Sequence, residues 1–153
     1  MSTSEGRRSP YQGLVPYAEE DASYFFGRDQ ECDLVVANLL ACRLTLLYGP
    51  SGVGKTSLLH AGVVHHLRSP AAGSIARRGV PLATAVFSSW RDDPLEGLVS
   101  SIAQAMAHVR GQLYDTSDIP ASPLHQAIQT ATRRGELLII LDQFEEYFLY
   151  HDQ

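Results

Sequence analysis

The stretch GPSGVGKT, residues 49–56, constrains the fold of this chain more than any other feature of its sequence. It satisfies the phosphate-binding pattern G-x-x-x-x-G-K-[ST] in full. A short apolar run precedes it, and a segment with the apolar spacing of a helix follows it. A phosphate-binding loop joins a strand to a helix in this way, so the pattern predicts a nucleotide site at the turn between them.

Each residue type in this loop has a chemical reason to be there. Glycines let the backbone turn its N–H groups inward around phosphate oxygens, and a helix that starts near Lys55 directs its positive end at the same phosphates. Lys55 supplies a positive charge to the β- and γ-phosphates, and the Thr56 hydroxyl coordinates Mg²⁺. The alternative is a glycine-rich turn with an exposed lysine. The predicted nucleotide contacts are Gly49, Pro50, Ser51, Gly52, Val53, Gly54, Lys55, Thr56 and Ser57.

Strands and helices alternate along the chain, which indicates an α/β domain with a parallel sheet. The predicted strands are 44–48, 81–89 and 136–141, and the predicted helices are 28–42, 54–67, 93–109 and 123–134. Together with the loop, this order predicts the three-layer α/β/α architecture of P-loop NTPases. Residues 1–10 are predicted to be a flexible tail and residues 11–153 to be the P-loop NTPase domain, in which 11–26 lack regular structure.

The run LLIILD, residues 137–142, predicts a buried strand that places one acid at its carboxyl end. Ligands of open α/β sheets bind at that edge, so Asp142 is predicted to hold Mg²⁺ together with Thr56. Glu145 and Glu146 follow closely enough to orient or deprotonate an attacking water. The alternative for both glutamates is the acidic first turn of a helix, which the helix dipole stabilises.

The composition excludes several classes of function. The chain has 153 residues, of which 44% are hydrophobic and 19% charged, and this balance is that of a globular protein. A net charge of −5 offers no attraction to nucleic acid or to an anionic membrane. The polar start MSTSEGRRSP lacks the apolar segment of a secretory signal, and no apolar run is long enough to span a membrane. A cytoplasmic location is therefore expected.

Four segments together resemble the novel STAND NTPase 1 domain, a family of signal-transducing ATPases related to the AAA-type and NACHT groups. The segments are PYAEEDASYFFGRDQE, LLYGPSGVGKTSLLHAGVVHHL, WRDDPLEGLVSSI and LLIILDQFEEYF. The resemblance implies that Phe26, Gly27 and Arg28 border the adenine of the nucleotide, and that Glu31 completes a GRxxE pattern. It also implies that, of the two glutamates after Asp142, Glu145 ranks above Glu146 as the catalytic candidate.

The resemblance further implies a nucleotide switch, in which Mg²⁺-dependent binding of ATP and its slow hydrolysis to ADP and phosphate toggle a larger protein between two states. In the family, a sensor strand lies between the loop-bearing strand and the Asp-bearing strand, and helices and a winged helix follow. We therefore expect this fold to be truncated after the strand that ends at Asp142, and its turnover to be weak. Protein partners, or missing C-terminal domains of the same switch protein, are expected.

Two other functions fit the sequence less well than a switch ATPase. The main alternative is a catalytically inactive fragment that binds nucleotide or another protein. A GTPase is disfavoured because the guanine-reading pattern Asn-Lys-x-Asp occurs nowhere in the chain. A small-molecule kinase is disfavoured by the FGR element and the paired acids.

Overall fold

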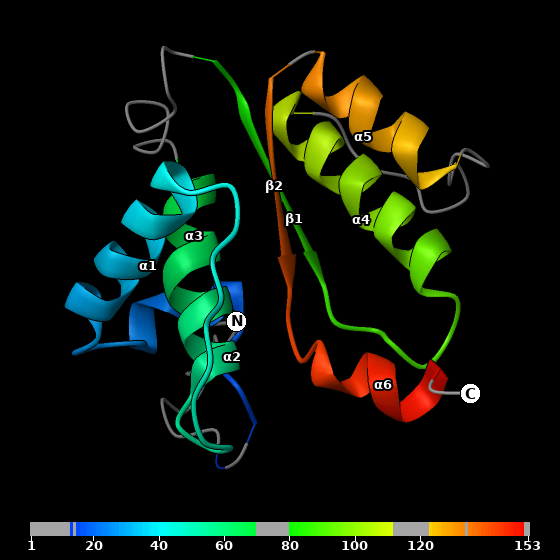
Figure 1. The fold of residues 1–153 in the computed structure, drawn as a ribbon. Coiled ribbons are helices and arrows are strands. Elements are labelled where there is room, and N and C mark those ends of the chain that lie inside the picture. The colour runs from blue at the N-terminus through cyan, green and yellow to red at the C-terminus, as the bar shows by residue number, and fades with distance from the viewer. Residues whose placement is uncertain (1–12, 14, 70–79, 112–122, 134, 152–153) are drawn as a thin grey trace, which may run out of the picture. The chain divides into compact units, whose positions relative to one another are not determined.

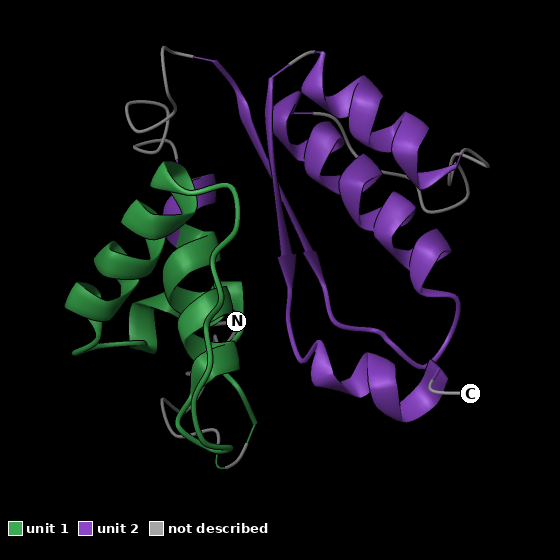
Figure 2. Ribbon diagram, viewed as in Figure 1, with its two compact units in different colours: residues 1–65 green, residues 66–153 purple. Residues whose placement is uncertain are grey.

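The computed structural model describes residues 13, 15–69, 80–111, 123–133 and 135–151. The chain divides into two units, residues 1–65 and residues 66–153 (Figure 2). Figure 1 shows the elements in chain order. Their bounds are η1 Glu19–Tyr24, α1 Asp29–Ala41, α2 Lys55–Ser57, η2 Leu58–Val64, α3 His65–Arg68, β1 Leu82–Phe87, α4 Pro94–Val109, α5 Leu124–Thr132, β2 Glu136–Leu141 and α6 Glu145–His151.

The first unit opens with a 3₁₀ helix, η1, where the sequence predicted no regular structure. Asp21 closes this turn from both sides. Its Oδ2 accepts a hydrogen bond from the N–H of Ala18 at 3.1 Å, and its own N–H donates to the carbonyl of Ala18 at 3.1 Å. Acidic residues in the first turn also suit the positive end of the helix. These local bonds are the reason that the prediction was wrong.

The helix predicted over 28–42 is confirmed as α1, and it packs against η2. They pack tightly at Gly62, where an added Cβ would collide with the Sγ of Cys32. Burial raises the pKa of the Cys32 thiol, so this packing involves a neutral sulfur atom. The helix predicted after the loop is also confirmed, from Lys55 to Arg68, but its middle section, η2, has the wider turn of a π-helix.

The apolar run 44–48 has no regular secondary structure, so the prediction of a buried strand there is wrong. The side chains of Leu44, Leu46 and Tyr48 are between 81% and 87% exposed. A strand needs a neighbour that bonds its backbone N–H and C=O groups. Among the described residues the sheet consists of β1 and β2, and neither pairs with this run. The run has the composition of a strand without the partner that would make it one.

In the second unit, β1 and β2 form a parallel ladder whose register pairs Leu82 with Glu136 and Phe87 with Leu141. Both strands and their parallel direction were predicted. Helices α4 and α5, also predicted, lie side by side over one face of this ladder (Figure 1). The core under them consists of Ala83, Ala85, Ile102, Ala105 and Ala131. Small side chains on β1 let α4 approach the strand closely.

Asp93 caps the start of α4. The Oδ1 atom of Asp93 accepts hydrogen bonds from the N–H groups of Leu95 and Glu96, at 2.9 and 3.2 Å. These bonds satisfy two of the amides that a helix leaves unpaired at its first turn. The cap thereby fixes the beginning of α4 directly after Asp93.

Arg68 bonds the edge of β1 that faces away from β2. The carbonyl of Phe87 accepts a hydrogen bond from the N–H of Asp142 at 2.9 Å, so Thr84, three residues earlier, turns its backbone groups away from β2. The Thr84 carbonyl accepts a hydrogen bond from Nη2 of Arg68 at 2.8 Å. The guanidinium therefore gives a donor to a backbone carbonyl on the side of β1 that no strand pairs with in the described residues.

The outer edge of β2 has no further strand among the described residues. β2 is accordingly less buried than predicted, with Ile140 buried and Leu141 41% exposed. A fully buried parallel strand has neighbours on both edges, and β2 is bonded along one edge in the part of the chain that the structure describes. The sequence predicted the strand correctly but predicted more burial than β2 has.

These elements make an α/β fold with a two-stranded parallel sheet in the described residues. The three-layer architecture and the extent of the domain, residues 11–153, stay predictions. The tail predicted over residues 1–10 lies outside the described residues. Across the described ranges, no helix combines the length and the apolar character needed to cross a membrane.

The contact between α1 and η2 predicts that Gly62→Ala destabilises the protein, although alanine normally favours a helix. The added methyl group would overlap the sulfur of Cys32, and such overpacking typically costs about 1–3 kcal/mol in the free energy of unfolding. Urea denaturation measures this loss. The double variant Gly62→Ala with Cys32→Ala removes the overlap and is expected to be more stable than Gly62→Ala alone. A Gly62→Ala protein as stable as the unchanged chain would contradict the close packing.

Candidate functional site

The phosphate-binding loop lies in the first unit, and two of its glycines have backbone angles that favour glycine. Gly52 has a φ of 81° and Gly54 a φ of 80°, both in the left-handed region. Gly49 lies outside that region, and an added Cβ there would meet Val53 Cγ2 at an ordinary 3.7 Å. The backbone thus favours glycine at Gly52 and Gly54 and makes no such demand at Gly49.

Lys55 is the single lysine of the chain, beside eleven arginines, and it begins the helical run after the loop. Its Nζ donates hydrogen bonds to the carbonyl of Gly49 at 2.9 Å and to the carbonyl of Pro50 at 3.0 Å. The ammonium is thus held against the backbone at the start of the loop. A phosphate would offer it charged oxygens, which bind an ammonium more strongly than neutral carbonyls do.

The helical run after Lys55 is tied to the opening segment of the chain. The Oγ of Ser57 accepts a hydrogen bond from the N–H of Tyr17 at 3.1 Å. Ser57 was predicted to contact nucleotide, and in the structure its hydroxyl bonds the backbone of Tyr17. Thr56, beside it, is half-buried at the first turn of the run.

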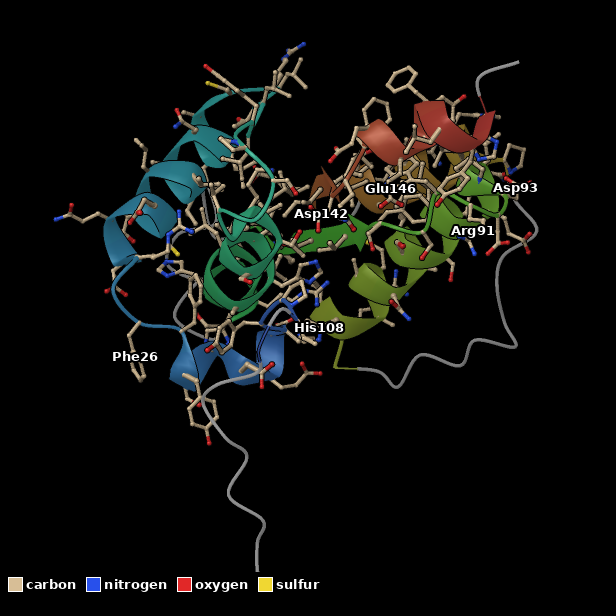
Figure 3. The ribbon with its side chains drawn as sticks, turned by 90° about the horizontal axis from the view of Figure 1, so that it is seen from below. Phe26, Arg91, Asp93, His108, Asp142 and Glu146 are labelled. Atoms are coloured by element: carbon tan, nitrogen blue, oxygen red, sulfur yellow. The ribbon has the colours of Figure 1, made fainter. Side chains whose placement is uncertain are left out.

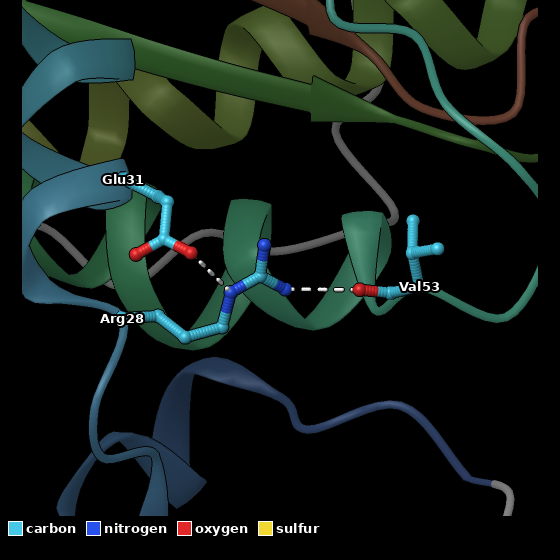
Figure 4. Close-up of polar contacts among 3 residues, drawn as sticks. All are labelled: Arg28, Glu31 and Val53. Atoms are coloured by element: carbon cyan, nitrogen blue, oxygen red, sulfur yellow. Dashed lines mark hydrogen bonds and ion pairs between the residues drawn. The ribbon is translucent and has the colours of Figure 1, made fainter.

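The FGR element, residues 26–28, lies beside the loop in the same unit. The Phe26 side chain is 77% exposed and projects away from the neighbouring ribbon (Figure 3). Arg28 turns toward the loop instead: its Nη1 donates to the carbonyl of Val53 at 2.9 Å, and its Nε bonds Glu31 Oε1 at 3.2 Å (Figure 4). Contact of these residues with adenine stays a prediction.

Asp142 lies in the second unit, at the carboxyl end of β2, and is 5% exposed. Its N–H bond to Phe87 extends the ladder by one residue, and its Oδ1 accepts a hydrogen bond from the N–H of Gln143 at 3.0 Å. Gln143 has a φ of 54°, a left-handed angle that is uncommon for a residue with a side chain. This turn ends the strand abruptly and leaves the acid at the sheet edge where the sequence predicted it.

Trp90, the first residue of the segment WRDDPLEGLVSSI, lies at this same edge. It is 2% exposed, and its Nε1 donates a hydrogen bond to the carbonyl of Asp142 at 2.7 Å. The carbonyl of Trp90 accepts in turn from Nε2 of His151 in α6, at 2.6 Å. The signal available in the sequence is its position. Trp90 follows β1 as Asp142 follows β2, and the carboxyl ends of parallel strands meet at one edge.

Helix α6 begins with the two predicted acids, Glu145 and Glu146. Glu145 is exposed and Glu146 is half-buried. The positive end of the helix stabilises acids at both positions, which alone would account for them. A role in orienting water stays a prediction for both. On the same helix, Tyr147 packs edge-on against the Trp90 ring, with 6.0 Å between centroids.

The candidate residues therefore fall into two groups, one in each unit. The first group holds the loop, Lys55 and Thr56, and the second holds Asp142 and the two glutamates. A Mg²⁺ site shared by Thr56 and Asp142 would join the groups, and it stays a prediction. Within the described ranges, no cluster of three His, Cys, Asp or Glu side chains could hold a metal by itself. A metal ion bound here would also need oxygen ligands from the nucleotide.

The comparison with protein families decides the class to which these groups belong. The family described as Novel STAND NTPase 1 matches residues 10–153. The chain belongs to this family. The family confirms the resemblance that the four sequence segments suggested, and it makes the chain a STAND NTPase module. No curated protein and no solved structure matches the chain. The roles of individual residues in this STAND NTPase module thus rest on the geometry of the two units.

The bond between Trp90 and Asp142 predicts that Trp90→Phe destabilises the second unit. Phenylalanine keeps an aromatic ring among Phe87 and Tyr147 but leaves a buried carbonyl without its donor, which costs about 1–3 kcal/mol. Chemical denaturation measures this loss. Tyr147→Phe is the matched control, because it keeps its ring in the same cluster and is expected to leave the stability nearly unchanged. Equal stability of the two variants would show that the indole N–H bond contributes nothing.

Proposed function

We propose that this STAND NTPase module binds ATP in the presence of Mg²⁺ and hydrolyses it slowly to ADP and phosphate, as part of a signalling switch. The observation that carries the proposal is the backbone of the loop. Left-handed angles at Gly52 and Gly54 come directly before a helical run that begins with the single lysine, Lys55. A turn of this form gathers N–H groups and a helix N-terminus around one anion.

In the proposed complex, the N–H groups of the loop bind the phosphate oxygens, and the Lys55 ammonium exchanges the carbonyls of Gly49 and Pro50 for the β- and γ-phosphates. The exposed ring of Phe26 supplies an apolar surface on which adenine can stack. The family membership of the chain supports a nucleoside triphosphate as the ligand.

The residues present suit a magnesium ion. Mg²⁺ prefers oxygen ligands, and the Thr56 hydroxyl and the Asp142 carboxylate are of this kind. The carboxylate is 5% exposed, and a buried negative charge is stabilised by a cation. When bound, the ion would offset negative charge on the phosphates.

Hydrolysis in this proposal requires one carboxylate beside the attacking water. Glu145 is the first candidate and Glu146 the second, both from the first turn of α6. The carboxylate orients the water and takes its proton as the oxygen bonds to the γ-phosphorus. The bond from the γ-phosphorus to the bridging oxygen breaks, and ADP leaves. Lys55 stabilises the charge that develops on the phosphate oxygens.

The role of Lys55 predicts that Lys55→Ala weakens ATP binding about 10–100-fold, the range expected for losing a charge-assisted hydrogen bond to phosphate. Isothermal titration of the full chain with ATP measures the change. Arg43→Ala removes one exposed positive charge from the same unit and is expected to bind ATP like the unchanged chain. Phosphate release that persists undiminished in Lys55→Ala would contradict hydrolysis at this loop.

The role of Asp142 predicts a different pattern for Asp142→Asn. The variant keeps the size of the side chain and its acceptor for the Gln143 N–H, but loses the charge that a divalent ion needs. ATP affinity in Mg²⁺ is expected to fall to the affinity measured in EDTA, which itself stays unchanged. Titrations of both proteins with and without Mg²⁺ test this. A variant with the full Mg²⁺ enhancement would remove Asp142 from the metal site.

A second candidate function is an interaction module without catalysis. Two observations favour it. Leu44, Leu46 and Tyr48 are exposed, and β2 has an edge without a partner strand among the described residues. Such edges accept an added strand from another segment or chain. This candidate predicts that ATP titration gives no heat, or gives binding with no phosphate release. Phosphate release that Lys55→Ala abolishes would rule it out as the sole function.

A further inference from the structure

We propose that Arg28 is a positioning residue that holds the phosphate-binding loop in its nucleotide-binding shape through the carbonyl of Val53. The inference rests on the proposed nucleotide binding and adds a residue to it. Arg28 lies 25 residues before Val53 in the chain, so this bond joins two separate segments of one unit. Figure 4 shows the guanidinium between Glu31 on one side and the Val53 carbonyl on the other.

The geometry of the peptide bond explains how a residue outside the loop can prepare it. In a trans peptide the C=O and the following N–H point in opposite directions within one plane. A guanidinium that holds the Val53 carbonyl therefore directs the N–H of Gly54 away from Arg28. Gly54 has the left-handed φ of 80°, and its amide belongs to the turn proposed to bind phosphate. Arg28 thus fixes the direction of one donor of that turn without contacting the ligand.

Glu31 completes the arrangement by fixing the guanidinium itself. Its Oε1 bonds Nε of Arg28 at 3.2 Å from one turn further along α1, which leaves Nη1 directed at Val53. The planar fork of arginine can satisfy both partners at once, whereas a lysine ammonium is a single point charge on a flexible chain. The two bonds together use the geometry of arginine and not merely its charge.

The contact with the loop is close as well as polar. A Cβ added at Gly54 would lie 3.2 Å from Nη1 of Arg28, tighter than an ordinary contact. The guanidinium therefore lies in close contact with the Val53–Gly54 peptide, which leaves that peptide little room to rotate. A rotated peptide would turn its carbonyl, and not its N–H, toward a phosphate, and two acceptors cannot bond to each other.

The experiment separates this role from contact with adenine by using a ligand that has no base. Inorganic tripolyphosphate and ATP are titrated separately into the full chain and into Arg28→Ala, Arg28→Lys and Glu31→Ala. Arg28→Ala and Arg28→Lys are expected to weaken both ligands by the same factor, about tenfold, which is the low end for a hydrogen bond to a charged group because Arg28 is partly exposed. Glu31→Ala is expected to weaken both ligands to a smaller extent. Arg43→Ala is the control for charge and is expected to change neither.

A second measurement needs no ligand. In NMR relaxation of the ligand-free chain, Arg28→Ala is expected to lower the order parameters of the Gly52 and Gly54 amides while those of α1 and η2 stay unchanged. Affinity lost for ATP but kept for tripolyphosphate would overturn the proposal and assign Arg28 to the base. Unchanged order parameters in the loop would also overturn it. An unchanged chain that binds neither ligand would overturn the proposed function, and the order parameters would still decide the role of Arg28.

Discussion

The course of the loop from Gly49 to Thr56 depends on left-handed backbone at Gly52 and Gly54, where a side chain would strain the turn. That course determines where the helical run begins, and hence where Lys55 stands. It also determines that the Val53 carbonyl faces outward, within reach of Arg28. The nucleotide chemistry proposed for this STAND NTPase module therefore begins with a constraint on the backbone, and the charged side chains act on a shape that the glycines permit.

In the second unit, the position of Asp142 depends on the parallel pairing of β1 with β2. Because parallel strands end at the same edge, the pairing brings Trp90 and Asp142 together although they are 52 residues apart in the chain. The indole N–H holds the carbonyl of Asp142, and the left-handed angle at Gln143 turns the chain away directly afterwards. The backbone that carries the Asp142 carboxylate is thus held in place by the Trp90 bond and by the turn at Gln143. A group that binds a metal ion benefits from such preorganisation, since less freedom is lost on binding.

The sequence predicted the longer helices and the parallel pair of strands, and it missed the short helix η1 and the hydrogen bonds that join distant segments. The helices α1 and α4 and the strand β1 follow from short stretches of residues. The bonds of Trp90 and Arg28 join segments far apart in the chain, and no spacing rule reveals them. The run 44–48 shows the same limit in reverse, because its β-forming composition is local, whereas a strand requires a neighbour.

The central claim is that the loop of the first unit and the acid of the second serve one metal–nucleotide complex. The most direct measurement replaces Mg²⁺ by paramagnetic Mn²⁺ and follows the amide NMR signals of the full chain as Mn²⁺·ATP is added, because the ion broadens the signals of nuclei near it. We predict that the signals of Gly54 and Gln143 broaden together over the same range of added complex, while Mg²⁺·ATP leaves their widths unchanged. Broadening confined to the loop, with the signals of Asp142 and Gln143 unaffected, would contradict the claim.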